Sequence, residues 1–246
     1  MTALLQTQDL TLAFGGLVVA NGINFSLEEG ERLAVIGQNG AGKTTFINIC
    51  TGLLKPSKGR VSLAGRDITG QSPRKIVKQG MARSFQLPQL FLEHTVRECL
   101  QLSAVARAGK LSSWNMLARG SCAKEIDRML DLISLRDRQD ELCINLPEGQ
   151  RKLLDVGMSL MLQPKLLILD EPTSGVSTEE KHGVMEILMR ALDDQKVTAI
   201  FVEHDVDIVK RYATRVAAWI SGAIAADGDP ASVLTNPLIL REVLGE

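Results

Sequence analysis

One segment constrains this chain more than any other, because it places two glycines around four residues and follows them with a lysine and a threonine. A compact apolar run, residues 32–36, precedes this segment, and a helical pattern continues after it through Ile47 and Leu53. A strand, a glycine-rich loop and a helix in this order let backbone N–H groups converge on a phosphate, since glycine allows the turn without steric cost. We therefore expect phosphate contacts from Gly37, Gln38, Asn39, Gly40, Ala41, Gly42, Lys43, Thr44 and Thr45.

Two side chains of this loop have separate expected roles. Lys43 is expected to reach the β- and γ-phosphates of a nucleotide, and the Thr44 hydroxyl is expected to bind Mg²⁺. The alternative is an ordinary glycine-rich turn between a strand and a helix, and the consecutive Lys-Thr-Thr argues against it.

A second apolar strand, residues 166–169, ends in two carboxylates, Asp170 and Glu171. Such a pair at the end of a buried strand is costly unless a cation lies nearby. A metal-nucleotide site removes that cost, with Asp170 holding Mg²⁺ and Glu171 polarising the water that attacks the γ-phosphate. Two solvated acids at the surface end of a strand are the alternative.

Composition and charge limit the classes of function. The 246 residues are 45% apolar, which is enough for a substantial core in one large α/β domain or two small ones. With 28 basic and 29 acidic residues the formal net charge is -1, and aromatic residues make up 4%. Neither value supports binding to nucleic acid through bulk charge or a surface of stacking rings.

The N-terminal residues and the cysteines indicate a cytosolic chain. Residues 1–9 contain no basic stretch followed by an apolar stretch, so no secretory signal is visible. An uncharged stretch at 10–27 is interrupted by glycines and asparagines, which favours two strands and a turn over a membrane span. The four cysteines lie far apart and have no spacing typical of a metal or redox motif, which favours a reducing compartment. They are Cys50, Cys99, Cys122 and Cys143.

The pattern of apolar residues divides the chain into three kinds of segment. Residues 4–31 alternate short apolar runs with turns, as in antiparallel strands joined by hairpins. Residues 95–161 have helical spacing, with a capping box at Thr95 and Glu98 and a further helix that begins near Pro147. Strand and helix then alternate, which predicts a mostly parallel sheet, and residues 215–227 predict a hairpin that turns at Ser221 and Gly222.

Taken together, these features resemble the nucleotide-binding subunits of ABC transporters along essentially the whole chain. Gln86 and His204 carry little weight alone, but they fall in the order expected of that family. The order is the loop at 37–44, the glutamine loop at Gln86, the signature Leu146-Pro147-Glu148-Gly149-Gln150, the strand at 166–170, Glu171, the D-loop at 174–177 and the switch histidine His204.

The resemblance implies an α/β fold of the P-loop NTPase type, specifically the ABC ATPase fold. We expect a mixed core sheet, an N-terminal antiparallel β layer and a helical signature subdomain. Residues 1–246 would form a single ABC ATPase domain, in which 1–84 and 164–246 are the RecA-like core with the β layer and 85–163 are the helical subdomain. The implied activity is hydrolysis of ATP with Mg²⁺.

Site roles also follow from the resemblance. Glu171, His204 and Gln86 would be catalytic, and Gln86 would also contact Mg²⁺ and sense the γ-phosphate. Phe14 would stack on adenine, and its alternative is a core phenylalanine.

In this family two subunits face each other head to tail, so that the signature of one contacts the ATP bound to the other. The expected contacts across the interface come from Leu146, Pro147, Glu148, Gly149 and Gln150. The signature departs from the family pattern, because serine usually stands where Pro147 is and a small residue where Glu148 is. We expect a weakened composite site and a heterodimer with a second, more regular ATPase subunit.

The tail at 228–246 and the segment at 82–86 look like those of ATPases from branched-chain amino acid importers and their urea and short-amide relatives. The implied partners are integral membrane permease subunits and, indirectly, a periplasmic or extracellular solute-binding protein, with this chain on the cytoplasmic face of the membrane. The permease would bind near Leu87, Leu90 and Phe91, unless these residues form a local core cluster. Alternatives are a soluble ABC ATPase, an export or lipid-transport ATPase, and a small-molecule kinase, which Glu171 beside Asp170 disfavours.

Overall fold

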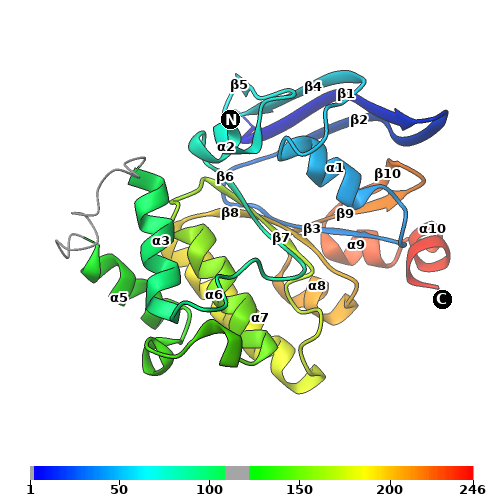
Figure 1. Ribbon diagram of the computed structural model, residues 1–246. Coiled ribbons are helices and arrows are strands. Elements are labelled where there is room, and N and C mark those ends of the chain that lie inside the picture. The colour runs from blue at the N-terminus through cyan, green and yellow to red at the C-terminus, as the bar shows by residue number, and fades with distance from the viewer. Residues whose placement is uncertain (1–2, 109–121, 246) are drawn as a thin grey trace.

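The computed structural model describes residues 3–108 and 122–245, and its centre is a sheet of six strands (Figure 1). The strand order is β10-β9-β3-β8-β7-β6; β10 and β9 are antiparallel, and the other neighbours run parallel. The bounds are β3 Arg32–Gly37, β6 Met81–Ser84, β7 Leu166–Asp170, β8 Thr198–Val202, β9 Arg215–Ile220 and β10 Ala223–Gly228. Parallel strands align their carboxyl ends at one edge, and this edge carries the candidate site.

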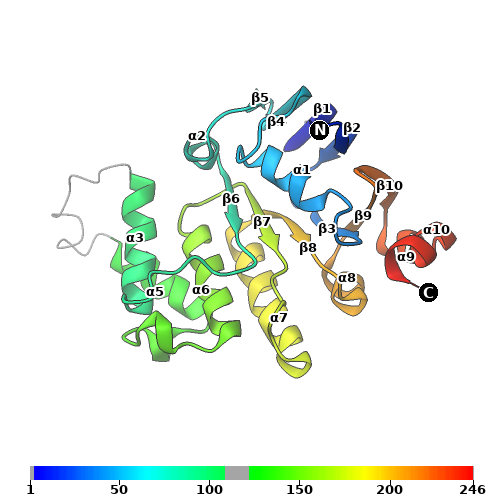
Figure 2. The same cartoon turned by 45° about the vertical axis from the view of Figure 1, so that its right-hand side comes forward.

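A second, antiparallel sheet has the order β2-β1-β4-β5 and lies above helix α1, Lys43–Cys50 (Figure 2). Its strands are β1 Leu5–Phe14, β2 Leu17–Leu27, β4 Lys58–Leu63 and β5 Arg66–Asp67. The uncharged stretch at 10–27 forms the end of β1, the turn at Gly15 and Gly16, and β2, as predicted. No helix in residues 3–108 or 122–245 is long and apolar enough to cross a membrane.

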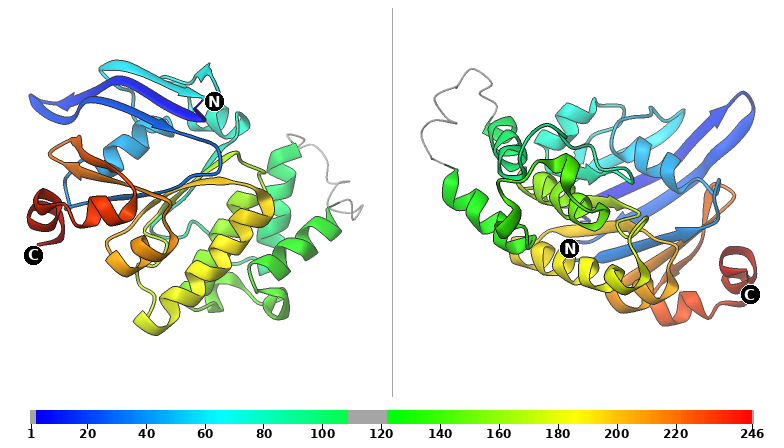
Figure 3. Two further views of the ribbon diagram at one scale, coloured as in Figure 1. Left: turned by 180° about the vertical axis from the view of Figure 1, so that it is seen from behind. Right: turned by 60° about the horizontal axis from the view of Figure 1, so that its bottom comes forward.

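The helices lie mainly on the other side of the central sheet. Figure 3 shows α6 and α7 packed against one face of this sheet, with α1 and the antiparallel sheet on the opposite face. The remaining bounds are α2 Pro73–Lys78, α3 Val96–Ala108, α5 Ala123–Leu132, α6 Glu148–Leu160, α7 Thr178–Gln195, α8 Val206–Tyr212, α9 Pro230–Leu234, α10 Pro237–Ile239, the 3₁₀ helices η1 Arg136–Arg138 and η2 Cys143–Asn145, and the π-helix η3 Leu240–Leu244.

The two faces of the central sheet belong to two apolar cores. Along β3, Leu33 and Val35 pack into the core with α1, whereas Ala34 and Ile36 pack into the core with the helices of the opposite face. Successive side chains of a strand point to opposite faces, so a strand covered on both sides must be apolar throughout. This explains the uninterrupted apolar runs at 33–36 and 166–169.

Several local predictions are confirmed. The Thr95 N–H donates to Glu98 Oε2 at 2.8 Å and the Glu98 N–H donates to Thr95 Oγ1 at 3.2 Å, which is the reciprocal capping box. Ser221 and Gly222 join β9 to β10. Pro147 lies one residue earlier than a first helical position, because its φ of -57° and ψ of 155° make it the N-cap and α6 begins at Glu148. Residues 109–121 of the predicted helical insert lie outside the described residues.

The fold also brings two cysteines together. Cys99 on α3 and Cys143 in η2 are free, buried thiols whose sulfur atoms are 3.4 Å apart. Burial raises the pKa of the Cys143 thiol to about 12, so it stays protonated at neutral pH. This contact could not be predicted from the sequence, because the two residues are 44 positions apart.

Candidate active site

The glycine-rich loop connects β3 to α1. Gly40 and Gly42 have φ values of 81° and 100°, which glycine adopts without the strain that other residues incur. A Cβ at Gly42 would lie 2.6 Å from the Val19 carbonyl oxygen, so this position also requires the missing side chain. The Gly222 N–H donates to the Ala41 carbonyl oxygen at 2.8 Å and fixes the loop against the β9–β10 turn.

The Lys43 ammonium lies inside the loop. Its Nζ donates to the carbonyl oxygens of Gly37 at 2.6 Å and Gln38 at 3.0 Å. Burial lowers its pKa, and the negative charges of Glu171 and Asp170 act in the opposite direction. Thr44 and Thr45 follow in the first turn of α1, where the helix N-terminus favours a bound anion.

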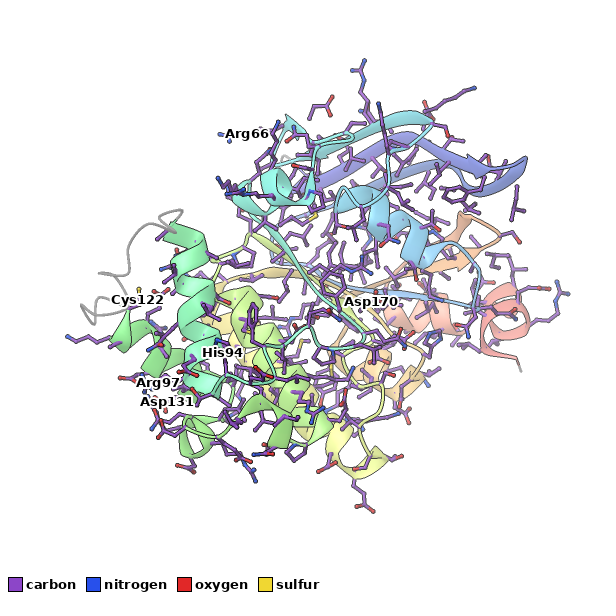
Figure 4. The ribbon with its side chains drawn as sticks, in the orientation of Figure 1. Arg66, His94, Arg97, Cys122, Asp131 and Asp170 are labelled. Atoms are coloured by element: carbon purple, nitrogen blue, oxygen red, sulfur yellow. The ribbon has the colours of Figure 1, made fainter. Side chains whose placement is uncertain are left out.

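At the end of β7, Asp170 forms a buried ion pair with a residue that the sequence analysis did not assign. Arg83 Nη2 on β6 lies 2.5 Å from Asp170 Oδ2, and the two side chains are 8% and 11% exposed. Arg83 Nη1 also donates to Asn48 Oδ1 on α1 at 2.6 Å. Arg83 thus joins α1, β6 and β7 beneath the loop. Figure 4 shows Asp170 near the middle of the molecule, well apart from Arg97 and Asp131 of the helical part.

The Glu171 carboxylate is held from two sides. Gln86 Nε2 donates to Glu171 Oε2 at 2.6 Å, and His204 Nε2 lies 3.2 Å from Glu171 Oε1. In the His204 tautomer that carries its proton on Nε2, His204 donates this hydrogen bond and a carboxylate oxygen accepts it. Glu171 has a φ of 49°, in the left-handed region that costs a non-glycine residue about 1–2 kcal/mol. The structure therefore brings together three residues, Gln86, Glu171 and His204, that come from separate loops.

A buried glutamate links the turn after Glu171 to the histidine loop. Glu203 Oε1 accepts from Thr173 Oγ1 at 2.6 Å and from the Thr173 N–H at 3.3 Å. Its Oε2 accepts from the His204 N–H at 3.1 Å. The position of His204 is thus fixed through the main chain as well as through its ring.

The signature segment lies elsewhere on the same chain. Leu146 is buried, Pro147 caps α6, and a Cβ at Gly149 would lie 3.4 Å from Val184 Cγ2 on α7. Glu148 Cγ would lie 3.5 Å from a Cβ at Gly175, so its side chain faces the D-loop of its own chain. Within the described residues, no hydrogen bond or ion pair joins residues 146–150 to the loop at 37–44.

Phe14 lies at the end of β1 and is 53% exposed, so it is not a core residue. Leu17 and Val18, across the hairpin turn, are also exposed. The hairpin approaches the loop through the contact of Val19 with Gly42. The stacking of Phe14 on adenine stays a prediction.

Exposed apolar side chains gather where the Gln86 segment leads into α3. Leu87 and Phe91 are 73% and 49% exposed, whereas Leu90 is half-buried and packs against the helical core. The Ile144 N–H donates to the Leu92 carbonyl oxygen at 3.2 Å, which sets a second segment beside the first. We call this surface the apolar face; its exposed residues are Leu87, Phe91, Leu92, Leu142 and Ile144.

The predicted Mg²⁺ donors suit that ion chemically. Thr44, Gln86 and Asp170 offer a hydroxyl, an amide oxygen and a carboxylate, which are the oxygen ligands Mg²⁺ prefers. Arg83 engages only Oδ2 of Asp170, and the carboxylate has a second oxygen. No cluster of three His, Cys, Asp or Glu residues arranged to hold a metal occurs in the described part of the chain. Such a site fits an ion whose other ligands are phosphates and water.

Comparison with known proteins assigns the family. The model of the family described as ABC transporter matches residues 20–174, more than half of the chain. The chain belongs to this family. It is an ABC ATPase that binds nucleotide and hydrolyses ATP, and its fold is the P-loop ABC ATPase fold.

Relatives match this ABC ATPase over almost its entire length. A probable branched-chain amino acid transport ATP-binding protein LivG of Archaeoglobus fulgidus is 34% identical over 98% of this chain and 95% of its own. The high-affinity branched-chain amino acid transport ATP-binding protein BraF of Pseudomonas aeruginosa is 32% identical over 99% and 98%. The ADP conformation of MJ1267, an ATP-binding cassette of an ABC transporter, superposes with a TM-score of 0.84 at 30% identity and covers both chains fully.

Four charged residues near the site were not assigned from the sequence. Arg83 and Glu203 stand beside predicted site residues, at the end of β6 and directly before His204. Lys152 and Asp155 are buried on α6 among apolar neighbours such as Leu153 and Val156. The sequence signal that could have identified Lys152 and Asp155 is a charged residue among the buried apolar positions of a helix, because charged residues are rarely buried without a partner.

Proposed function

We propose that this ABC ATPase is the motor subunit of an importer that takes up a small polar solute such as a branched-chain amino acid, urea or a short amide. The observation that carries the catalytic part is the Glu171 carboxylate between Gln86 and His204 at the carboxyl end of β7. The transport part is supported by the relatives named for branched-chain amino acid transport.

In this proposal Glu171 polarises the attacking water, and Gln86 and His204 hold that carboxylate and contact the γ-phosphate. Lys43 and the loop amides bind the β- and γ-phosphates, and Phe14 stacks on adenine. Thr44, Asp170 and Gln86 would hold Mg²⁺, which neutralises charge on the phosphate oxygens when it is bound.

Residues 1–84 and 164–246 would form the nucleotide-binding core, and 85–163 the helical subdomain. Two subunits would face each other head to tail, with residues 146–150 of one reaching the ATP of the other. The N-terminus of α6, a helix of 13 residues, presents free N–H groups and a positive dipole end, which suits a phosphate.

The composite site that uses this signature is proposed to be slow. Pro147 offers neither a hydroxyl nor an N–H to a phosphate, and the Glu148 carboxylate adds negative charge to the same turn. We therefore propose a heterodimer with a more regular second ATPase. Pro147→Ser should raise the ATPase rate of the complex, whereas Pro73→Ser, at the first turn of α2, should not. An unchanged or lower rate in Pro147→Ser would reject this part of the proposal.

The apolar face is proposed as the contact for a short helix of the permease, on the cytoplasmic side of the membrane. Leu87 and Phe91 are exposed, and Leu87 directly follows Gln86, so a contact there can respond to the nucleotide. Leu87→Ser with Phe91→Ser should uncouple ATPase activity from the permease and leave ATP binding intact. Leu53→Ser is the control, because Leu53 is about as exposed as Phe91 but follows α1. Unchanged coupling would reject the site.

The decisive experiment is purification from membranes with Glu171→Gln, which should stop hydrolysis and retain ATP between the subunits. Glu179→Gln, the same change at an exposed residue of α7, should behave like the wild type. Recovery of permease-like proteins, a second ATPase and an associated solute-binding protein supports the importer motor. Recovery of soluble partners alone would overturn the transport assignment and favour a soluble ABC ATPase.

A further inference from the structure

Two charged residues on α6 are buried with main-chain groups as partners. Lys152 and Asp155 are 4% and 7% exposed. Lys152 Nζ donates to the carbonyl oxygens of Gln86 and Glu171, each at 3.0 Å. In the described part of the chain no carboxylate forms an ion pair with Lys152. The hydrogen bonds of Lys152 therefore fix the main-chain conformation of the two loops that contain Gln86 and Glu171.

Asp155 holds the same loop from the next turn of the helix. Its Oδ2 accepts from the Phe85 N–H at 3.2 Å, and its carboxylate also accepts from the Gln89 N–H. Residues three apart lie on one face of a helix, so Lys152 and Asp155 reach residues 85–89 together. The segment that carries Gln86 is thus fixed to α6 through main-chain atoms on both sides of that residue.

Lys152 also fixes the main chain of Glu171. The Glu171 N–H donates to the Val202 carbonyl oxygen at 3.1 Å, and its own carbonyl accepts from Lys152. A non-glycine residue keeps a left-handed backbone only where its surroundings hold it there. Lys152 is one of the groups that hold it, and the same ammonium holds the Gln86 carbonyl.

We infer that Lys152 and Asp155 are positioning residues that join the signature helix to Gln86 and Glu171 of the same chain. α6 begins directly after Pro147, so a small movement of the helix on contact with the ATP of the opposite site moves both residues. The Gln86 amide and the Glu171 carboxylate move with them. The inference rests on the proposed function, because it uses the catalytic role of Glu171 and the head-to-tail dimer.

Substitutions that change the charge of Lys152 or Asp155 but keep the side-chain length distinguish a positioning role from a simple packing role. Lys152→Met keeps the length of the side chain and removes the donor, so kcat for MgATP should fall tenfold or more while KM stays within twofold. Lys152→Arg restores a cation that can reach both carbonyl oxygens and should recover most of kcat. Asp155→Asn keeps an acceptor without the negative charge and should lower kcat by a smaller factor, about threefold.

The control is Arg107→Met. Arg107 Nη1 donates to the Met161 carbonyl oxygen at 2.9 Å, just beyond the C-terminal end of α6. The substitution Arg107→Met should therefore leave kcat unchanged. A second readout is amide hydrogen exchange in the full-length protein. Exchange of residues 85–89 should accelerate in Lys152→Met, and exchange of α1 should not.

The experiment is run on the full-length chain with the subunits that co-purify, beside Glu171→Gln. Wild-type kcat in Lys152→Met together with an inactive Glu171→Gln would overturn this inference and leave the proposed function standing. Equal losses in Lys152→Met and Arg107→Met would also overturn it, since both would then report general destabilisation. Full activity in Glu171→Gln would overturn the inference and the proposed catalytic role together.

Discussion

Asp155 gives the sharpest prediction about stability, because its carboxylate is buried and burial disfavours the ionised form. Burial raises its pKa to about 6 from 3.8, and the N–H groups of Phe85 and Gln89 act in the opposite direction. A raised carboxyl pKa means that the folded state binds the proton more tightly than the unfolded state. Stability from this group is therefore full at low pH and lost as the pH rises through about 6.

The size of the effect follows from the two pKa values. At about 1.4 kcal/mol for each pH unit between them, the ionised Asp155 lowers the free energy of unfolding by about 3 kcal/mol at pH 7.5 and by about 1 kcal/mol at pH 4.5. Asp155→Asn does not titrate, so it removes this dependence. Any constant loss from the altered hydrogen bonds is the same at both pH values and cancels in the comparison.

The assay is urea unfolding of the wild type and Asp155→Asn at pH 7.5 and pH 4.5. The variant should gain about 2 kcal/mol more relative to the wild type at the higher pH than at the lower. Asp67→Asn is the control for a general pH effect, because Asp67 is exposed on β5 and hydrogen bonds from Thr69 lower its pKa. An equal change in Asp155→Asn at both pH values would refute the reasoning, as would a loss that grows with pH.

Three further substitutions test other contacts by urea or thermal unfolding. Thr95→Ala removes the cap of α3 and should cost about 1 kcal/mol; no loss would contradict the capping box. Gly59→Ala places a Cβ 2.5 Å from the Asp9 carbonyl oxygen at a φ of 87°. It should cost about 3 kcal/mol, whereas Gly65→Ala, with open space around it, should cost about 1 kcal/mol. Arg83→Met leaves Asp170 buried without its cation and should cost about 3 kcal/mol; a smaller loss on addition of MgATP would show that the ligand supplies the missing charge.

Local patterns predicted much of the fold and part of the site. The loop at 37–45 depends on three glycines within six consecutive residues, and the two acids that directly follow the strand at 166–169 mark its end. The hairpin at Ser221 and Gly222 and the capping box at Thr95 are also short-range features. In each case the residues that determine the structure lie within a few positions.

The contacts that the sequence did not reveal join distant segments. The partners of Lys152 are 66 and 19 positions away, and Arg83 meets Asp170 from 87 positions away. Lys152 bonds to carbonyl oxygens, and every residue has a carbonyl, so no residue type marks the partner. The direction of the Glu148 side chain depends in the same way on where the D-loop lies after folding.

The position of β3 in the sheet has a consequence for synthesis of the protein. β3 carries the glycine-rich loop at its end, and its neighbours β8 and β9 lie about 160 residues or more further along the chain. Pairing over such a separation is slow because a long loop must close first. The phosphate-binding loop emerges early from the ribosome, but β3, which carries it, has no partner in the central sheet until residues 198–220 are made. The nascent chain therefore carries the glycine-rich loop through most of its translation before the central sheet can form around β3.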